Sequence, residues 1–517
     1  MKRFNVAMLH NIPWSISFWS ARQRFAGQPA LFCAEGSITH LDLARRTAAI
    51  AEALLDAGAA QGETVIWCLP NSIDAVAATY AILVGGWCEL PINPQATSSE
   101  RERFVRLAGA AVAICEEEDA EAFTALGCRV VCPTRLPSRD FVADHFEPVD
   151  PAKWARFVFT SGSTGDPKAI VHSQAGRWSG TLLQRAALPV MPRPGMRLLA
   201  MTPFSHGASL LTHAFLDGGA SVELLRGVDL DRVLPALRRG DVDVMFAPPT
   251  VLAKICAALA GERIGSLRAI LTGTAPMPAN VYRAARDIFG PIVRMTYGKS
   301  EAFNPIAILD ADATDAFLSS EESTRSTCVG WLEAGVEVRI RDEAGHIVPA
   351  GESGEIDVRT QHMSIGTFDG ELHLWPDGWH GTGDVGRFDE IGRLHLVGRV
   401  ADAIKSGGYK VYPAEIEQAL ASAADLPAVA IVALPSEYWG DIITAVAETA
   451  DASWRQRAEA ACDSMARYKR PRFFLEMSEL PRNAQHKVVR RSVVERILLD
   501  WRVEDGPRPR LVPRANG

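Results

Sequence analysis

The sequence predicts an α/β fold of at least two domains, in which helices cover parallel sheets. Short β-rich runs alternate with Ala- and Leu-rich helical segments, as in residues 41–55, 63–68 and 72–84. This alternation is typical of βαβ units, whose strands run parallel. The length of 517 residues also exceeds what one hydrophobic core usually serves. We therefore expect a large α/β domain built of parallel-sheet subdomains, followed by a smaller domain.

Three places in the chain are expected at the carboxyl ends of buried strands. Residues 242–247 and 267–271 are apolar runs that end in turns rich in Pro, Thr or Gly, which predicts further buried strands. Ligand sites of parallel sheets lie at the carboxyl ends of their strands. On this interpretation Thr160, residues 272–273 and residues 297–298 face such a site.

The pattern of the chain changes after about residue 326. Residues 336–341, 354–359 and 392–397 alternate apolar and polar side chains between Gly-containing turns. Such alternation predicts a small antiparallel, β-rich subdomain. Residues 504–517 carry Pro, Gly and charge without periodicity, so we expect this tail to be disordered.

Composition narrows the class of protein. Apolar residues make up 47% of the chain and charged residues 22%, as in ordinary globular proteins. The net charge of -8 argues against nucleic-acid binding, which needs a concentrated basic face. No run of 18 apolar residues is present, so we expect no membrane span. The nine cysteines include no CxxC pair, which favours buried, reduced thiols in a cytoplasmic protein over disulfides or zinc ligands.

A segment rich in glycine and hydroxyl groups is suited to binding phosphates. Residues 160–168 read Thr-Ser-Gly-Ser-Thr-Gly-Asp-Pro-Lys and follow an apolar run. Its two glycines let the backbone approach an anion closely, while amides and hydroxyls face the phosphate oxygens and Lys168 adds a cation. The Walker pattern requires a lysine directly after the second glycine, whereas two residues intervene here. The segment predicts a phosphate-binding loop of another kind, the alternative being a solvated connector.

Further motifs follow this loop in order, and with it they identify a family resemblance. They lie at residues 297–301, 382–384, 398–408 and 481–490. As a set they resemble the adenylate-forming superfamily of acyl-CoA synthetases, nonribosomal peptide synthetase adenylation domains and luciferases. The resemblance implies an N-terminal adenylate-forming domain at residues 1–399, a hinge at 400–402 and a small mobile C-terminal α+β domain at 403–503.

The resemblance implies roles around ATP and magnesium. The loop that holds the β- and γ-phosphates is matched by Thr160, Ser161, Gly162, Ser163, Thr164, Gly165 and Lys168. Glu301 matches the glutamate that coordinates magnesium, and Thr160 also lies at a metal position. The adenine and ribose positions are matched by Gly273, Thr274, Ala275, Pro276, Tyr297, Gly298, Ser300, Asp384 and Arg399. Of these, Asp384 accepts hydrogen bonds from both ribose hydroxyls, whereas Thr274 and Ser300 depart from the residues commoner in the family.

Lys487 matches the lysine that bridges the attacking carboxylate and the α-phosphate in the first half-reaction. The glycine usual before it is replaced by His486, which restricts φ in the loop that must insert the lysine. Asp402 matches the hinge on which the small domain rotates. The face exposed by that rotation carries Lys405, Gly407 and Gly408. There, paired glycines would let a pantetheine arm pass close to the backbone, although an ordinary tight turn is the alternative.

Two histidines and a set of bulky residues are further candidates. His206 lies where acyl-CoA synthetases often carry a histidine near the acyl carbonyl, as a gate or a base, and a structural role is the alternative. His172 is expected to pack or cap. We expect the acyl pocket to include Phe204, Phe246, Thr272 and Phe303, whose bulk favours an aromatic or medium cyclic acid.

The resemblance implies an ATP- and magnesium-dependent ligase that forms an acyl-adenylate and passes the acyl group to an acceptor. Coenzyme A is the favoured acceptor. The main alternative is an amine or amino acid, as in amide-bond synthetases similar to coronafacate ligase, and a free carrier protein is another. A non-catalytic nucleotide-binding protein on the same scaffold is the alternative from a different class, against which the retained Lys487, Glu301, Asp384 and Arg399 argue.

Overall fold

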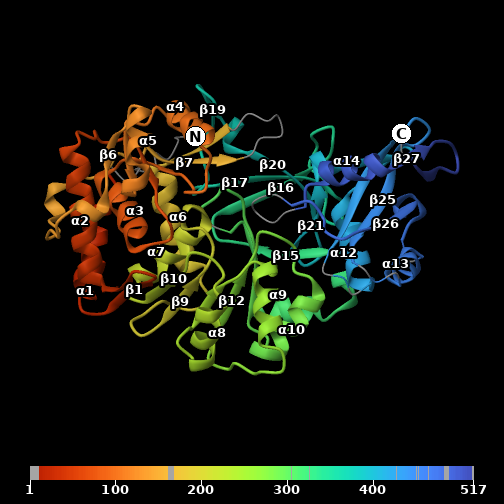
Figure 1. The fold of residues 1–517 in the computed structure, drawn as a ribbon, viewed down its shortest axis with the longest axis horizontal. Helices are drawn as coiled ribbons and strands as arrows, with labels where there is room; N and C mark the ends of the chain where they lie inside the picture. The colour runs from red at the N-terminus through yellow and green to blue at the C-terminus, as the bar shows by residue number, and fades with distance from the viewer. Residues whose placement is uncertain are drawn as a thin grey trace, which may run out of the picture.

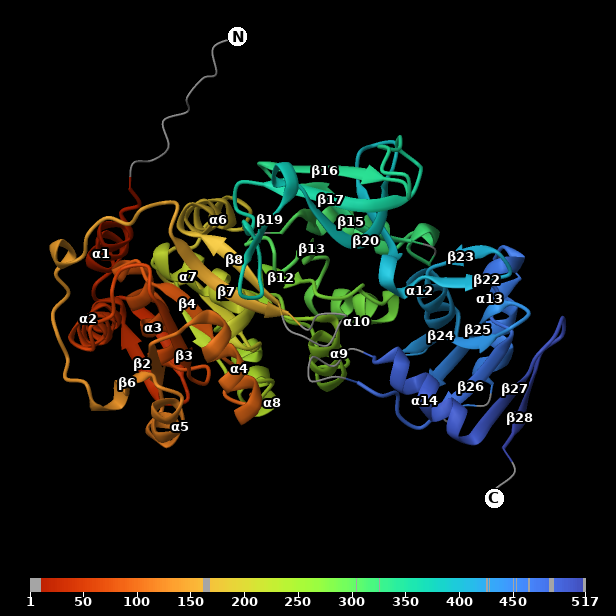
Figure 2. The same ribbon diagram turned by 90° about the horizontal axis from the view of Figure 1, so that it is seen from above.

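The fold is α/β, as the sequence predicts, and its strands form three larger sheets and a hairpin (Figure 1). The computed structural model describes residues 11–160, 168–303, 305–324, 326–424, 426, 428–449, 451, 453–463, 465–482 and 488–514. The described elements from β22 onward form a separate body at one end of the molecule, as both views of the ribbon show (Figures 1 and 2).

The largest sheet has 13 strands and combines a parallel with an antiparallel half. In order across the sheet they are β16 (Val336–Arg341), β17 (Gly354–Thr360), β20 (His380–Phe388), β21 (Leu394–Arg399), β15 (Thr327–Leu332), β14 (Ala307–Leu309), β13 (Val293–Tyr297), β12 (Ala269–Thr272), β11 (Val244–Phe246), β9 (Arg197–Ala200), β10 (Ser221–Leu224), β1 (Pro29–Cys33) and β2 (Gly36–Thr39). Pairings from β1 to β13 are parallel, and those from β13 to β16 are antiparallel. The β-rich part expected after residue 326 therefore continues the sheet of the parallel strands.

A second sheet has eight strands, and two of them flank the predicted phosphate-binding loop in the chain. Its order is β19 (Leu372–Leu374), β18 (Gly366–Phe368), β8 (Lys168–Ser173), β7 (Trp154–Thr160), β4 (Cys88–Pro91), β3 (Thr64–Cys68), β5 (Val112–Cys115) and β6 (Arg129–Val131). The third sheet consists of β23 (Tyr409–Val411), β22 (Ile404–Ser406), β25 (Gly440–Glu448) and β24 (Val429–Ser436), with β26 (Phe473–Met477) paired to β25.

Helices connect and cover the strands. They are α1 (Trp14–Arg24), α2 (His40–Asp56), α3 (Ile73–Gly85), α4 (Ser98–Ala108), α5 (Ala120–Ala125), α6 (Gln174–Ala186), α7 (Ser209–Asp217), α8 (Leu230–Arg239), α9 (Pro249–Ala258), α10 (Ala279–Phe289), α11 (Ala311–Leu318), α12 (Pro413–Ala424), α13 (Trp454–Cys462) and α14 (Arg490–Asp500). A π-helical turn, η4 (Phe204–Ala208), precedes α7, and a 3₁₀ turn, η5 (Glu321–Thr324), follows α11. Among the described residues, no helix is long and apolar enough to cross a membrane.

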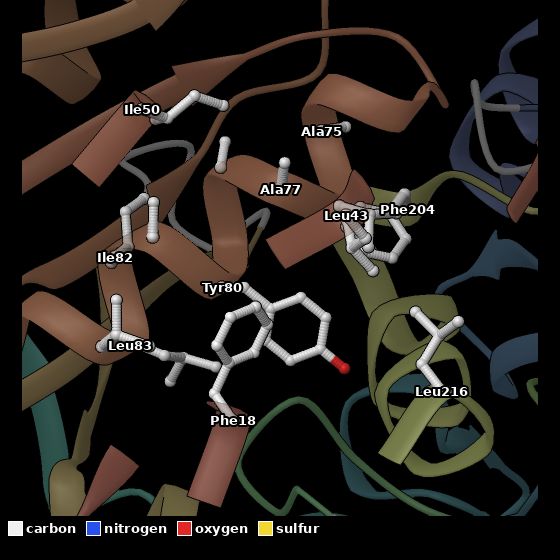
Figure 3. Close-up of a cluster of buried hydrophobic side chains, with 14 of the residues drawn as sticks. Phe18, Leu43, Ile50, Ala75, Ala77, Tyr80, Ile82, Leu83, Phe204 and Leu216 are labelled. Atoms are coloured by element: carbon white, nitrogen blue, oxygen red, sulfur yellow. The ribbon is translucent and has the colours of Figure 1, made fainter. Parts of the chain in front are cut away.

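Helix α2 illustrates how local sequence sets these elements. Thr39 and Asp42 form a reciprocal capping box at its start, which satisfies two backbone N–H groups that would otherwise lack partners. Leu43, Ile50 and Leu54 recur at helical spacing and are fully buried. They join a core in which α1, α2, α3 and α7 pack together, with the rings of Phe18, Tyr80 and Phe204 among them (Figure 3).

The C-terminal body contacts the large sheet through α12. Gln418 donates from Nε2 to the carbonyls of Ser323 (2.6 Å) and Ser326 (2.9 Å), and it accepts from Thr327. Lys410 also forms an ion pair with Glu343 at 2.8 Å. These contacts place α12 against η5 and β15 in this arrangement.

The C-terminal tail differs from the expectation, whereas the cysteines agree with it. The tail from residue 504 is not disordered throughout, because β27 (Trp501–Glu504) and β28 (Arg510–Pro513) form an antiparallel hairpin. The sequence interpretation missed this hairpin, since the proline-rich turn hides its two short strands. The nine cysteines are free and buried, as expected.

Candidate active site

The predicted strand ends are confirmed, but they belong to two different sheets. Thr272 and Tyr297 end the adjacent parallel strands β12 and β13, whereas Thr160 ends β7 of the eight-stranded sheet. A contact between His172 on β8 and the segment after β13 links the two sheets: its Nε2 lies 3.0 Å from the carbonyl of Ser300. The candidate site therefore lies where the two sheets meet.

Asp384 on β20 has several donors around its carboxylate. Tyr297 donates its hydroxyl to Oδ2 at 2.7 Å, and Lys299 Nζ lies 3.2 Å from the same oxygen. Arg399 Nε donates to Oδ1 at 3.0 Å. Burial and the charge of Asp384 raise the pKa of Tyr297, so its hydroxyl keeps the proton that it donates. The structure thus brings together three residues that the sequence assigns to adenine and ribose, and it adds Lys299, which the sequence interpretation missed.

Glu301 lies in the same segment and is held as a carboxylate. Burial raises its pKa, but the neighbouring His380 imidazole and the Lys299 ammonium outweigh that effect, and the pKa is lowered. His380 Nε2 is 3.5 Å from Glu301 Oε1, an ion-pair distance without the geometry of a good hydrogen bond. The ring of Trp375 packs on His380 at 4.3 Å between centroids. Neither His380 nor Trp375 was assigned a role from the sequence.

His172 has the packing role that the sequence predicts. Its ring lies 4.1 Å from that of Phe303, and its buried Nδ1 has no hydrogen-bond partner among the described residues. Burial lowers the pKa of His172 to about 3, so the ring is neutral at physiological pH. Gly180 on α6 makes room for this arrangement, because a Cβ there would lie 2.7 Å from that of Phe303.

The turn after β12 is shaped by a close contact and by an unusual backbone conformation. A Cβ on Gly273 would lie 2.7 Å from Thr296 Oγ1, so glycine is required for β12 and β13 to approach here. Thr274 follows with φ of 71°, a left-handed conformation that a β-branched residue rarely adopts. Thr274, Ala275 and Pro276 are all exposed. An exposed, strained turn at a strand end is consistent with a ligand-lining role.

Buried polar side chains form hydrogen bonds to the backbone of the turn η4, which carries His206. Asn71 accepts from the Phe204 amide at 2.8 Å, and Arg156 donates to the Ser205 carbonyl at 2.6 Å. Arg156 and Arg177 both pair with Glu89 in the protein interior. Of His206 the structure describes only the backbone, so its predicted role stays a prediction. The charged cluster was not anticipated from the sequence.

The expected acyl-pocket residues do not share one environment. Phe204 is buried in the core beside Trp67, with 5.9 Å between their ring centroids. Thr272 is buried, and its hydroxyl has no hydrogen-bond partner in the part of the chain that the structure describes. Phe246 is half-buried at the end of the neighbouring strand. Phe303 packs on His172, at the junction of the two sheets. The expectation that these four residues line one acyl pocket stays a prediction.

Several predicted residues lie outside the described residues. They are Ser161, Gly162, Ser163, Thr164, Gly165 and Lys487. For Thr160 and Lys168 the backbone is described as the ends of β7 and β8, and their side chains are not. The assignment of these residues to phosphates, metal and catalysis stays a prediction.

The predicted acceptor face belongs to the C-terminal body, and the predicted hinge residue just before it pairs with that body. Asp402 accepts from Arg490 Nη1 at 3.0 Å, and Arg490 also donates to both oxygens of Glu417 at 2.8 Å. Gly407 and Gly408 have φ of 57° and 83° and form the two-residue turn of the β22–β23 hairpin. The glycines thus have the tight-turn role given as the alternative, and a passage for a pantetheine arm is untested.

A comparison with family models decides the identification. The model of the AMP-binding enzyme family matches residues 18–367. The chain belongs to the AMP-binding enzyme family. Its site motifs are those of the adenylate-forming superfamily, and the protein is an ATP-dependent adenylate-forming ligase.

Curated relatives of this AMP-binding enzyme are acid–thiol ligases. A feruloyl-CoA synthase of an Amycolatopsis species is 28% identical over 484 residues, which cover 89% of this chain and 94% of the relative. A 2-succinylbenzoate–CoA ligase of Bacillus cytotoxicus is 27% identical over 475 residues, with the same two coverages.

Solved structures similar to this AMP-binding enzyme include both kinds of ligase. The amide bond synthetase McbA from Marinactinospora thermotolerans has a TM-score of 0.81 and 27% identity, covering 93% of this chain and 99% of its own. The o-succinylbenzoate CoA synthetase MenE from Bacillus subtilis has a TM-score of 0.80 and 23% identity, covering 92% and 97%. The second likeness supports the fold alone.

The described residues of this AMP-binding enzyme include one ionised carboxylate that suits a magnesium ion. They contain no cluster of three or more His, Cys, Asp or Glu side chains able to hold a metal. Mg²⁺ in nucleotide sites commonly keeps several waters and uses one or two carboxylates plus phosphate oxygens. The ionised Glu301 is a carboxylate of this kind, and its assignment to magnesium stays a prediction.

Proposed function

We propose that the protein joins a carboxylic acid to ATP, forming an acyl-adenylate and pyrophosphate, and then transfers the acyl group to coenzyme A. The observation that carries the proposal is the Asp384 carboxylate, which contacts Tyr297, Lys299 and Arg399, together with the ionised Glu301, whose pKa Lys299 also lowers. A carboxylate of this kind accepts hydrogen bonds from a ribose diol. The carboxylate of Glu301 suits the magnesium that accompanies ATP.

In the first half-reaction an oxygen of the acid attacks the α-phosphorus of ATP. A P–O bond forms, the bond to the β-phosphate bridging oxygen breaks, and pyrophosphate leaves with the electron pair. Asp384 and Tyr297 hold the nucleoside end, and residues 160–168 cradle the phosphates that leave. Glu301 would hold the magnesium that accompanies ATP, and the ion would supply positive charge opposite the phosphates. Lys487 offsets the charge where the two anions meet, which is the kind of stabilisation that matters most in such reactions.

In the second half-reaction the acceptor thiol attacks the acyl carbonyl carbon. A C–S bond forms, the C–O bond to AMP breaks, and the thiol proton is released. We infer that the C-terminal body, residues 403–503, turns about Asp402 between the two steps. The ion pair of Asp402 with Arg490 lies at the start of α14, so it connects the hinge with the helix that follows Lys487.

Coenzyme A is the preferred acceptor because the relatives named above are coenzyme A ligases. Those names refer to aromatic acids, and Phe303 adds an aromatic ring at the site, so an aromatic or medium cyclic acid is the proposed substrate class. The buried, free cysteines agree with a cytoplasmic location, which we also propose.

Amide formation is the second candidate, with an amine attacking the acyl-adenylate. The observation that favours it is the similarity to McbA, whose identity to this chain is 27% at a TM-score of 0.81. A non-catalytic role is not supported, since the chain belongs to an enzyme family and retains Lys487, Glu301 and Asp384.

A panel of carboxylic acids with ATP and magnesium tests the proposal. Each acid is offered with coenzyme A or with a mixture of amino acids and amines, and products are identified by mass spectrometry. We expect AMP, pyrophosphate and an acyl-CoA with at least one aromatic or cyclic acid. Amide without thioester would replace coenzyme A by an amine as the acceptor, and no acid-dependent AMP from a broad panel would refute the function.

A further inference from the structure

Lys299 lies in the candidate site, but the proposed reaction assigns it no role. It lies in the segment after β13, and its Nζ donates to the Thr382 carbonyl at 2.7 Å and to Asp384 Oδ2 at 3.2 Å. Only 13% of its side chain is exposed. The ammonium therefore bridges the backbone and the side chain of β20, two residues apart.

The hydrogen-bond donors around Asp384 differ in how exposed they are to solvent. A carboxylate has about four acceptor positions, two on each oxygen. Oδ2 is occupied by the buried pair of Tyr297 and Lys299, whereas Oδ1 accepts from Arg399, whose side chain is 59% exposed. A ligand can replace or share the bond of an exposed arginine more easily than it can displace two buried donors. Oδ1 is thus the oxygen that this arrangement presents to a ligand.

Lys299 also balances charge within the site. Its ammonium is one of the groups that lower the pKa of Glu301, so its field reaches both acidic side chains. Removing it would leave Asp384 and Glu301 with less compensating charge opposite an anionic nucleotide. In a partly buried site this repulsion is weakly screened.

We propose that Lys299 is a positioning residue for ribose recognition. Together with Tyr297 it fixes Asp384 Oδ2, so that Oδ1 meets the ribose hydroxyls in a set orientation, and its charge makes that carboxylate compatible with a nucleotide phosphate. The proposal rests on the proposed role of Asp384 in binding ribose. It assigns the nucleotide site a further lysine, in addition to the predicted Lys168 and Lys487.

Binding of AMP and of 2′-deoxy-AMP to the full-length protein, measured by calorimetry, tests this role. The wild type is expected to prefer AMP. Lys299→Met should weaken AMP binding by on the order of tenfold, as expected for loss of a charge-assisted contact. Because Lys299→Met leaves Asp384 less well oriented toward the ribose hydroxyls, the affinities for AMP and 2′-deoxy-AMP should become nearly equal. Lys299→Arg should restore most of the ratio.

Lys469→Met is the matched control. Lys469 is also partly buried and paired with a carboxylate, Glu415, at 2.6 Å, but it lies in the C-terminal body away from Asp384. The Lys469→Met variant should show the same ratio of AMP to 2′-deoxy-AMP affinity as the wild type. If Lys299→Met does not fold, as judged by its thermal unfolding, Lys299→Gln replaces it, since an amide can still donate to the Thr382 carbonyl.

A wild-type affinity ratio in a folded Lys299→Met or Lys299→Gln variant would overturn the inference. A loss of ratio that Lys299→Arg does not recover would also overturn it, since the effect would then be structural. If the wild type itself fails to prefer AMP, the inference falls. Acid-dependent pyrophosphate release, measured on the same wild-type sample, then decides whether the proposed function falls with it.

Discussion

At the residue scale, the backbone of Thr274 is the clearest local departure from ordinary geometry. Its φ of 71° places a β-branched residue in the left-handed region, which costs about 1–2 kcal/mol. Replacing it by glycine removes this strain but increases the entropy lost on folding. We expect Thr274→Gly to stabilise the protein by about 0.5–1 kcal/mol in urea unfolding, and to lower the rate of ATP–pyrophosphate exchange if the strain holds the turn for the ligand.

Asp377 provides a matched comparison for Thr274. It also has a positive φ, of 51°, but aspartate tolerates this region better and the residue lies in a turn before β20. Asp377→Gly should therefore change stability less and leave exchange unaltered. A Thr274→Gly variant that is less stable than the wild type would show that the left-handed backbone is not strained.

The sequence predicts many residues of the site because the family motifs mark them directly. Tyr297, Asp384 and Arg399 were assigned from such motifs and are in contact. Lys299 and His380 were missed, because their contacts arise only when β13 and β20, far apart in the chain, come together in one sheet. The periodicity of the sequence cannot predict contacts between such distant segments.

At the scale of secondary-structure elements, a buried ion cluster joins β4, β7 and α6. Glu89 is fully buried between Arg156 and Arg177 and accepts from Trp67 Nε1 at 2.7 Å. Burial raises the pKa of Glu89, but the two guanidinium groups outweigh it and hold the pKa at about 2. The carboxylate is therefore ionised throughout the physiological range.

Glu89→Gln should destabilise the protein strongly, because it leaves two buried guanidinium groups without a counter-charge. We expect a loss of about 3–5 kcal/mol of unfolding free energy, measured by urea denaturation. Glu337→Gln, which breaks an exposed ion pair with Arg359, should change stability little. A similar small effect for both variants would mean that the buried cluster adds no more than a surface pair.

Individual elements were easier to predict than their partners. Residues 336–341 were predicted as a strand and form β16, and residues 41–55 lie within α2, because period and capping are local properties. Parallel-sheet subdomains were predicted, but which strand belongs to which sheet was not, since register and neighbours depend on the tertiary fold. Residues 510–513 were missed as a strand, because the paired hairpin lacks a long alternating pattern.

At the scale of the whole molecule, buried histidines predict how stability depends on pH. Burial lowers the pKa of His40 and His362 to about 4, and that of His172 and His213 to about 3. In the unfolded chain these groups titrate near 6.5. Unfolding therefore takes up protons below that pH, and the stability that the neutral rings provide is complete above about pH 6.5 and falls as the pH decreases.

Urea unfolding at pH 7.5, 6.5, 5.5 and 5.0 tests this dependence. The unfolding free energy should fall on acidification below about pH 6.5, by up to about 1.4 kcal/mol per pH unit for each buried histidine. His213→Gln removes one of the titrating groups, so its slope should be shallower than that of the wild type. A flat profile between pH 6.5 and 5.0 would contradict neutral burial of these rings.

The overall fold and the reaction class could be predicted because five motifs keep their order along the chain. The relative placement of the two ends of the molecule could not, since it depends on contacts such as Gln418 with Ser323 and Lys410 with Glu343. Neither pair has a signal in the sequence, because polar side chains at an interface resemble those at any solvated surface.

The most direct test of the adenylation chemistry is acid-dependent exchange of labelled pyrophosphate into ATP, compared between the wild type, Lys487→Ala and Lys469→Ala. Wild type and Lys469→Ala should exchange equally with an accepted acid. Lys487→Ala should be slower by on the order of a hundredfold, as is typical for loss of a group that stabilises transition-state charge. Exchange that is unchanged in Lys487→Ala, or absent from the wild type with every acid tried, would contradict the account.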